Sequence, residues 1–371
     1  MSTPGAAATS RAQHTILVAH LDAGHKRRKK TKKAIRSRTA LPTPPALTCQ
    51  SPAAKMNTIS RCEATPEDLS WGPIEHLAHY SCDSSANVTF DLSCLRVFKR
   101  PTALPFDLTQ GRQMFYVNNE HNRSYGHPIP LDSLSRACVA LGQEEKLRNA
   151  HVVTWRGVLV KLMLGIPIDL RFYAVAGVLH VLLYDHVPNV THASQLLTGY
   201  HGYAFESLCT PSTDTDTDTF EVPSLDVWKC IVRRQFGDLN IVFGGEVDCA
   251  KREYDGTSDC LMELKTEQIG AKARPSKYKK WVLQSWLMGI TEICVGYRDS
   301  YNQLQRVDFL PLEEMYTFAP GTLDISYRSC YKVLQELRAF CSTRGAEVEG
   351  ADNAWMVSVK KGVLLGEPRM I

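Results

Sequence analysis

Two apolar runs that enclose charged residues limit what this chain can fold into. The first, "NIVFGGEVDC", spans residues 240–249, and the second, "CLMELKTEQ", spans residues 260–268. Their composition predicts two strands, at 238–249 and 259–267, that are largely buried on at least one side. A carboxylate among buried apolar neighbours is costly unless a counter-charge compensates it. The fold must therefore bring a compensating group to these strands.

The charged residues in these runs are expected to share one face. Side chains two positions apart in a strand point the same way, so Glu246 lies beside Asp248 and Glu263 lies beside Lys265. If the strands pair through a turn near residues 255–256, three carboxylates and one ammonium meet. Such carboxylates repel one another unless they are protonated or bind a metal, for which Mg²⁺ or Mn²⁺ is suited. An acid-x-Asp strand followed by Glu-x-Lys is typical of metal-dependent phosphodiester hydrolysis.

An alternative interpretation of the same residues is a ladder of cross-strand salt bridges on an exposed face. The flanking apolar residues, Phe243, Val247 and Leu264 among them, disfavour that interpretation because they indicate burial. The pattern alone favours the metal site without excluding the ladder.

The rest of the chain mixes helical and strand patterns. Residues 86–98 and 291–299 are expected as strands, and 171–185 as a hairpin around Gly177. Helices are expected at residues 131–143, 193–209, 224–235, 276–289 and 324–343. The order is not a repeated strand–helix alternation. We therefore predict an α+β (mixed α/β) fold, with mixed sheets and flanking helices.

The helix expected at 276–289 has two distinct faces. Lys277, Lys280 and Gln284 share one face, while an apolar stripe that includes Trp286 occupies another. The polar face could offer phosphate-binding groups to the acidic strands, or it could simply be solvated.

The N-terminal segment differs in composition from the remainder. Residues 1–57 are rich in Pro, Ala, Ser, Lys and Arg, which predicts a disordered tail before a single catalytic domain at 58–371. Residues 26–38 carry nine Lys or Arg, so a net charge of +4 leaves about −5 (4 − 9) for the rest. Such a run indicates a nuclear localisation signal or a nucleic-acid contact, with a solvated tail as the alternative.

Two further observations bear on location. No apolar run approaches the roughly 18 residues of a membrane span, so no membrane association is expected. The twelve cysteines include no CxxC pair and follow no secretory signal, which favours reduced thiols. The sequence predicts a nuclear protein, with the cytoplasm as a second location.

Taken together, the motifs resemble the decapping exoribonuclease family, DXO and its fungal relatives. The resemblance runs from about residue 72 to 320. Its marks are "TWRGVLVK" (154–161), "GYAFE" (202–206), "GGEVDC" (244–249), "MELKT" (262–266), and "KYKKWVLQSWLMGI" with "VGYRD" (277–290 and 295–299).

This resemblance implies roles for individual residues. Glu206, Asp248, Glu263 and the Leu264 carbonyl would bind metal directly, and Glu246 would do so through water. Lys265 and Gln284 would contact the scissile phosphate or the attacking water, and Arg156 would bind substrate phosphate. The implied fold is that of metal-dependent nucleases with an acid followed by Asp/Glu-x-Lys, and the implied cofactors are two Mg²⁺, with Mn²⁺ as a substitute.

The implied activity is hydrolysis at the 5′ end of RNA during mRNA quality control. It would include release of pyrophosphate from 5′-triphosphate RNA, removal of incomplete caps and NAD caps, and 5′-to-3′ exonuclease action. One alternative is a weakly catalytic or non-catalytic subunit that stabilises a nuclear 5′-to-3′ exoribonuclease. Others are a DNA exonuclease and a non-catalytic RNA-binding protein with a basic tail.

Overall fold

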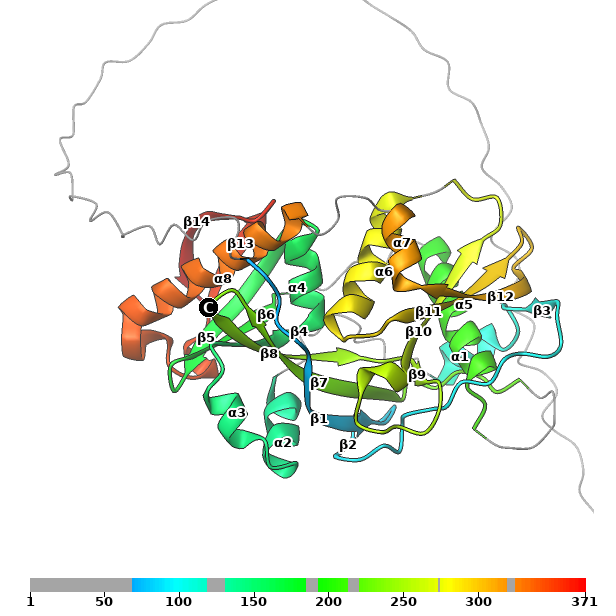
Figure 1. Cartoon of the computed structure of the whole chain (residues 1–371), viewed down its shortest axis with the longest axis horizontal. Helices are drawn as coiled ribbons and strands as arrows, with labels where there is room; N and C mark the ends of the chain where they lie inside the picture. Colours follow the sequence, from blue (N-terminus) through cyan, green and yellow to red (C-terminus); the bar gives the residue numbers. More distant parts are fainter. Residues whose placement is uncertain (1–68, 119–130, 185–192, 213–219, 273, 319–323) are drawn as a thin grey trace, which may run out of the picture. The chain divides into compact units, whose positions relative to one another are not determined.

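Two mixed β-sheets form the centre of the described chain (Figure 1). The computed structural model describes residues 69–118, 131–184, 193–212, 220–272, 274–318 and 324–371. The expected tail at residues 1–57 lies outside them, so the division into tail and domain stays a prediction.

The larger sheet has nine strands in the order β14-β13-β5-β6-β4-β8-β7-β1-β2. Strand β4 runs parallel to both neighbours, β6 and β8, and the other pairs are antiparallel. In chain order the strands are β1 (Glu75–Cys82), β2 (Val88–Thr89), β4 (Val152–Trp155), β5 (Ile168–Val175), β6 (Val178–Leu183), β7 (Val227–Phe236), β8 (Leu239–Glu246), β13 (Trp355–Lys360) and β14 (Val363–Met370).

The smaller sheet has five strands in the order β3-β12-β11-β10-β9. Only the pair β10–β11 is parallel within it. The strands are β3 (Phe106–Asp107), β9 (Cys249–Ala250), β10 (Leu261–Gln268), β11 (Glu292–Arg298) and β12 (Gln303–Pro311). The prediction of mixed sheets with flanking helices is confirmed.

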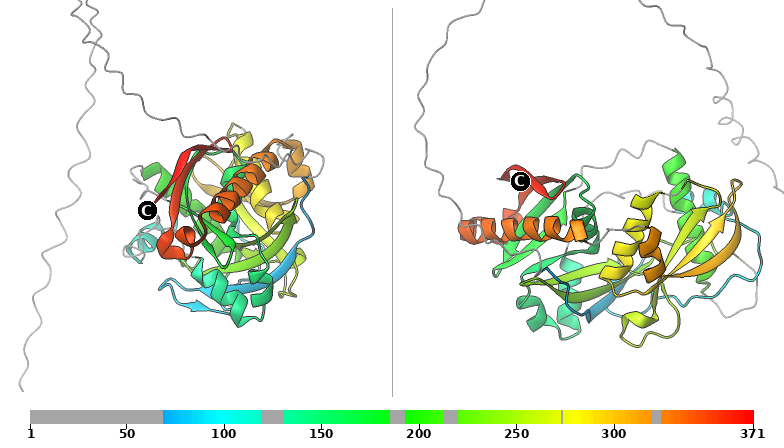
Figure 2. Two further views of the ribbon diagram at one scale, coloured as in Figure 1. Left: turned by 90° about the vertical axis from the view of Figure 1, so that its left-hand side faces the viewer. Right: turned by 45° about the horizontal axis from the view of Figure 1, so that its top comes forward.

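Helices cover both faces of each sheet, as Figures 1 and 2 show. On the larger sheet, α4 and α8 pack on one face and α2 on the other; on the smaller sheet, α5 packs on one face and α6 with α7 on the other. The helices are α1 (Arg112–Asn118), α2 (Asp132–Ala140), α3 (Glu144–Arg148), α4 (Arg156–Met163), α5 (Ala193–Cys209), α6 (Pro275–Leu287), α7 (Leu312–Phe318) and α8 (Asp324–Arg344). Among the described helices, none is long and apolar enough to span a membrane.

Strand alternation divides the core between these layers. In β4, Val152 packs with α4 and α8, whereas the next residue, Val153, packs with α2. In β11, Ile293 faces α6 and α7 while Cys294 faces α5. A central strand covered on both faces reads as a continuous apolar run, because both sets of side chains are buried.

That property explains one wrong prediction. The helix expected at 224–235 is strand β7, which lies between β1 and β8. Its residues from Trp228 to Val232 are all buried, so the run has no two-residue period.

The strand expected at 86–98 is also wrong for most of its length. Only β2, Val88–Thr89, forms there, apart from an isolated bridge at Val97. The Asp91 carboxylate accepts hydrogen bonds from Thr89 Oγ1 and Ser93 N, which turns the chain. The other expected elements form within a few residues of their predicted bounds.

The two acidic strands are not a hairpin. Strand β8 belongs to the larger sheet and β10 to the smaller one. The chain crosses between the sheets after Glu246, and only Cys249–Ala250 pairs with the start of β10, at Leu261 and Met262. The hairpin in which 238–249 would pair with 259–267 through a turn near residues 255–256 therefore does not form, and Asp248 lies in the crossover.

Candidate active site

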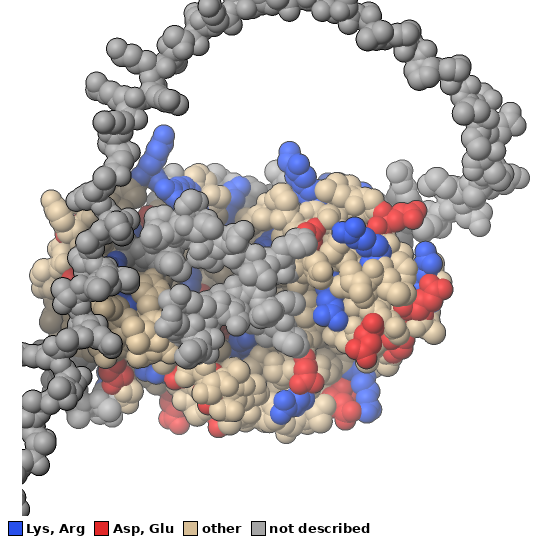
Figure 3. Space-filling model, turned by 180° about the vertical axis from the view of Figure 1, so that it is seen from behind, with Lys and Arg blue, Asp and Glu red and all other residues tan. Residues whose placement is uncertain are grey.

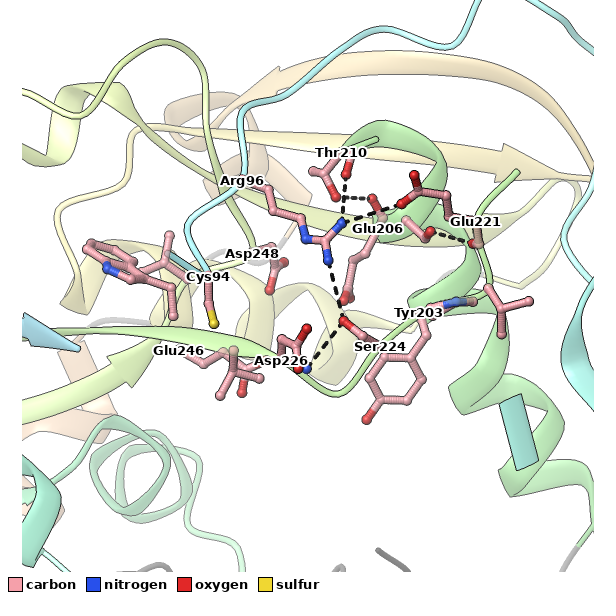
Figure 4. A pocket seen from close by; sticks show the side chains of 16 residues that line it. Cys94, Arg96, Tyr203, Glu206, Thr210, Glu221, Ser224, Asp226, Glu246 and Asp248 are labelled. Carbon is pink, nitrogen blue, oxygen red and sulfur yellow. Dashed lines mark hydrogen bonds and ion pairs between the residues drawn. The ribbon is translucent and has the colours of Figure 1, made fainter. Parts of the chain in front are cut away.

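The crossover between the sheets nevertheless gathers the predicted acids. Glu246 ends β8, Asp248 follows it, and Glu263 lies on β10. Glu206 reaches the same place from α5, and Figure 4 shows it across a hollow from Asp248 and Glu246. The hollow has a volume of about 70 Å³. The carboxylates thus converge through tertiary packing rather than through a hairpin.

Glu263 is the most deeply buried of these acids, with 1% of its surface exposed. Its Oε1 accepts a hydrogen bond from Arg156 Nη1 at 2.5 Å, and its Oε2 accepts one from Lys265 Nζ at 2.5 Å. Burial alone would raise the pKa of Glu263, but the two cations hold it below its usual range. Glu263 is therefore a compensated carboxylate.

Lys265 links Glu263 to Asp248. Its Nζ donates to Asp248 Oδ2 at 2.9 Å, and the backbone N–H of Leu264 donates to the same oxygen at 2.7 Å. Burial still raises the pKa of Asp248, although Lys265 opposes the rise. The order Glu263-Leu264-Lys265 thus supplies a carboxylate, a backbone donor and an ammonium in three consecutive residues.

Glu206 and Glu246 have less compensation. Burial raises the pKa of Glu206 well above its usual value, and the neighbouring Asp248 raises it further. Loss of hydration raises the pKa of Glu246, and Asp248 adds to that shift. Both shifts therefore come first from loss of hydration and second from the neighbouring carboxylate of Asp248.

Two consecutive glycines make room for the arginine of this site. A Cβ on Gly244 would lie 2.5 Å from the Trp155 ring, and one on Gly245 would lie 3.1 Å from both Cδ and Nε of Arg156. Because successive residues of a strand face opposite sides, Trp155 packs on one face of β8 and Arg156 on the other. The "GGE" sequence therefore places Arg156 against the backbone of β8.

Gln284 on α6 lies beside Arg156. Its backbone carbonyl accepts a hydrogen bond from Arg156 Nη1 at 3.3 Å. The helix face predicted from the sequence is only partly free, because Lys277 donates to Glu267 Oε2 at 2.7 Å and to the Thr266 carbonyl at 3.0 Å. Lys277 is thus engaged with β10.

Lys280, one turn along α6, belongs to a cluster of cations. Burial lowers its pKa, and repulsion from Lys265, Lys161 and Arg156 lowers it further. Lys161 lies in the last turn of α4. The sequence indicated Lys280 through its helix face, but it gave no role to Lys161, whose proximity depends on the packing of α4 against α6.

Arg96 is a further residue that sequence reasoning missed. It lines the hollow, where its Nη1 donates to the Thr210 carbonyl at 3.3 Å and its Nη2 to Ser224 Oγ at 3.4 Å (Figure 4). Thr210 follows the end of α5, so Arg96 anchors the helix that carries Glu206. The motifs identified in the sequence do not include Arg96, because its role depends on contacts with residues more than 100 positions away.

The face of the molecule opposite to that of Figure 1 carries charges of both signs. Seen from behind, the described surface carries Lys and Arg interspersed with Asp and Glu (Figure 3). On the described part of this face, an anionic ligand would therefore be attracted by individual cations rather than by a broad positive surface.

The donor set suits a hard divalent cation. Within the ranges described, no three His, Cys, Asp or Glu side chains are placed to share an ion directly. The Lys265 ammonium is the counter-charge of both Asp248 and Glu263 instead. Carboxylate oxygens are nevertheless the ligands that Mg²⁺ and Mn²⁺ prefer, so the residue types present fit such ions by their chemistry.

Comparison with known proteins identifies the family of this chain. Residues 73–364 match the family model described as RAI1 like PD-(D/E)XK nuclease. The chain is 28% identical over 270 residues to the decapping nuclease RAI1 of Yarrowia lipolytica, covering 64% of this chain and 74% of that protein. It is 29% identical to the Mycosarcoma maydis decapping nuclease RAI1, covering 62% of this chain and 59% of that protein.

Solved structures share the fold. The crystal structure of S. pombe Rai1 superposes with a TM-score of 0.64 at 20% identity, covering 82% of this chain and 95% of that one. Candida albicans Rai1 in complex with pU5 and Mn²⁺ gives a TM-score of 0.61 at 18% identity, covering 81% and 90%. The family match extends over most of the chain, and this protein therefore belongs to the RAI1-like PD-(D/E)XK nuclease family.

Proposed function

We propose that this protein hydrolyses phosphoanhydride and phosphodiester bonds at the 5′ end of RNA with the help of divalent metal ions. The observation that carries the proposal is the convergence of Glu206, Asp248 and Glu263 with Arg156 and Lys265 from separate elements. Acids that bind metal beside cations that bind phosphate are the parts that such hydrolysis needs. Family membership adds support, because the named relatives are decapping nucleases.

Glu206, Asp248, Glu263 and the Leu264 carbonyl would hold the ions directly, and Glu246 would act through water. Two Mg²⁺ are the proposed occupants, with Mn²⁺ as a substitute. Among relatives, Candida albicans Rai1 was crystallised with Mn²⁺ and Scheffersomyces stipitis Rai1 with calcium. Bound ions would supply activation of water and stabilisation of the leaving oxygen.

The remaining roles belong to polar groups around the acids. Arg156 would hold a non-bridging oxygen of the attacked phosphate. Its guanidinium lies beside Glu263, one of the proposed metal ligands, and it has further N–H donors for a phosphate. Lys265 would share its ammonium between that phosphate and the acids, and Gln284 would orient the attacking water. Lys161 and Lys280 would contact phosphates further along the RNA.

A single hydrolytic step would produce several activities, because only the leaving group differs. Pyrophosphate would leave 5′-triphosphate RNA, a cap dinucleotide would leave incompletely capped RNA, and NAD would leave NAD-capped RNA. A nucleotide would leave during 5′-to-3′ exonuclease action. Two relatives were crystallised with dinucleotides related to NAD: S. pombe Rai1 with 3′-FADP and Scheffersomyces stipitis Rai1 with (3′-NADP)+.

The test is direct. Purified protein is incubated with 5′-triphosphate, NAD-capped, unmethylated-cap and 5′-monophosphate RNAs, in Mg²⁺, Mn²⁺ or chelator. The double variant Glu246→Ala/Asp248→Ala is run beside Asp255→Asn, which alters an exposed acid at the turn that holds Thr257. Metal-dependent product that persists in Asp255→Asn and disappears in the double variant supports the proposal. No product from any RNA contradicts it.

A second candidate function is that of a partner subunit that stabilises a nuclear 5′-to-3′ exoribonuclease. The exposed strand β14 favours a protein-binding role, because it lies at the edge of the larger sheet and exposes Val363, Leu365 and Met370. Replacing Leu365 with Lys should abolish co-purification with the exoribonuclease while leaving RNA hydrolysis intact. Unchanged co-purification would reject this surface.

We also propose nuclear localisation through the basic run at residues 26–38. Deleting this run should move a fluorescently tagged protein out of the nucleus. An unchanged distribution would reject the proposal.

A further inference from the structure

Lys229 shares a row with Glu246 on one face of the larger sheet. Strand pairing places Tyr80 of β1 opposite Lys229 of β7, and Lys229 opposite Glu246 of β8. Residues opposite each other on neighbouring strands project to the same side. The row Tyr80–Lys229–Glu246 therefore lies on the α2 face of the sheet, and its last member is the acid at the end of β8.

The environment of Lys229 is unusual for a lysine. The residue is 7% exposed, and its Nζ lies 4.9 Å from the centroid of the Trp155 ring and 5.8 Å from that of Tyr80. Within the described chain, no carboxylate oxygen lies within the 4.0 Å of an ion pair with it. Two aromatic faces thus hold a buried ammonium that lacks a direct acidic partner.

The charge of this ammonium is only partly offset. The attraction between a cation and aromatic ring faces offsets part of the free energy that the cation loses with its hydration. A direct anionic partner would offset more of it. The field of Glu246 supplies another part, since it opposes the fall in the pKa of Lys229 that burial causes. Under the proposed function, divalent ions would share the charge of Glu246, and Lys229 would need another anion.

Lys229 and Arg156 lie on opposite sides of β8. Trp155, which walls Lys229, packs over Gly244, whereas Arg156 packs over Gly245. Lys161 and Lys280 cluster with Arg156 rather than with Lys229. A continuing RNA strand therefore has several cations on the Arg156 side of β8, whereas the other side offers the single ammonium of Lys229 between two aromatic rings, beside the strand end that carries Glu246.

We propose that Lys229, with Trp155 and Tyr80 as walls, forms a subsite for a phosphate of the leaving group, next to the attacked phosphorus of a 5′-triphosphate RNA. This subsite rests on the proposed function and deepens it. Lys229 would hold the departing pyrophosphate by its charge, and it would have little to contact when the leaving group is a nucleotide whose phosphate lies further away.

The experiment compares two leaving groups and one ligand. Lys229→Met keeps the stem of the side chain and removes its charge. The matched control is Lys146→Met: Lys146 lies on α3, and its ammonium is 2.6 Å from Glu75 of β1. For Lys229→Met, kcat/KM on 5′-triphosphate RNA should fall about tenfold or more, and kcat/KM on 5′-monophosphate RNA should change less than about threefold. Calorimetry should show at least about tenfold weaker binding of inorganic pyrophosphate to the Ca²⁺-loaded variant. Lys146→Met should match the wild type throughout.

Other outcomes overturn the subsite. An equal loss on both RNAs with unchanged pyrophosphate binding would show that Lys229 only positions Glu246, and no loss would show no role. Lys229→Gln repeats the comparison if the melting temperature of Lys229→Met shows that it is unfolded. If the wild type hydrolyses neither RNA but binds pyrophosphate through Lys229, the proposed hydrolysis fails while the subsite stands.

Discussion

Arg156 Nη1 lies 2.5 Å from Glu263 Oε1, although the two residues are 107 positions apart in the chain. Arg156 is the first residue of α4 on the larger sheet, and Glu263 lies on β10 of the smaller sheet. This ion pair ties the two sheets together at the point where the acids meet.

Breaking this pair from one side should destabilise the protein. Arg156→Met would leave Glu263 with Lys265 as its remaining cation, so we expect a loss of about 3 kcal/mol in the free energy of unfolding. Adding Glu263→Gln to Arg156→Met should restore part of that loss, because the uncompensated charge is removed as well. Chemical denaturation of the wild type and of these two variants measures the effect. Equal stability of Arg156→Met and the wild type would argue against a structural role for the pair.

The stability of the protein without added metal should depend on pH in a predictable direction. Because the folded-state pKa of Glu206 is raised, ionisation of this residue opposes folding as pH rises above its unfolded value of 4.5. Glu206→Gln should therefore stabilise the protein at pH 7 in chelator and have a smaller effect near pH 4.5.

Glu263 should behave in the opposite way. Its lowered pKa contributes stability that is present above the unfolded value of 4.5 and lost as pH falls through the folded value. Glu263→Gln should therefore destabilise the protein at pH 7. Thermal melts of both variants across this pH range decide the signs. A stabilising Glu263→Gln at pH 7 would be incompatible with the observed pairing.

Gly245 should be required for activity because of its contact with Arg156. The Cβ of Gly245→Ala would lie 2.9 Å from Met288 Sδ and 3.1 Å from Arg156 Nε, so Met288 must move and Arg156 must give way by a few tenths of an ångström. We expect a fall of about tenfold in kcat on RNA. Gly157→Ala is the matched control, since its Cβ would meet nothing within 4 Å in α4 and alanine favours a helix. Full activity of Gly245→Ala would show that the position of Arg156 is not critical.

Lys280 should contribute to RNA binding through its charge. Lys280→Gln should weaken binding of a short RNA and reduce the slope of log affinity against log salt by about one phosphate contact. Lys277→Gln should instead act mainly on stability, because Lys277 pairs with Glu267. Fluorescence anisotropy at several salt concentrations separates the two variants. An identical salt slope for Lys280→Gln and the wild type would exclude a phosphate contact.

The sequence by itself determined which residue types could meet and which elements carry them. The strand period put Glu263 beside Lys265 on one face of β10, and the Lys265 ammonium donates to Glu263 as that period predicts. The same ammonium also donates to Asp248. The helical period predicted α5 over residues 193–209, where it forms. These features depend on neighbours within a few residues, so local pattern was sufficient.

Only the tertiary structure decided how the acids come together. The strand pattern suggested a hairpin, but the chain changes sheets after Glu246, and β8 pairs with β4 and β7 instead. The buried residues of β7 concealed its strand period, and the ammonium of Lys229 acquired its aromatic walls from β1 and β4. Partners between strands distant in the chain are selected by the packing of whole layers, and no local period records that choice.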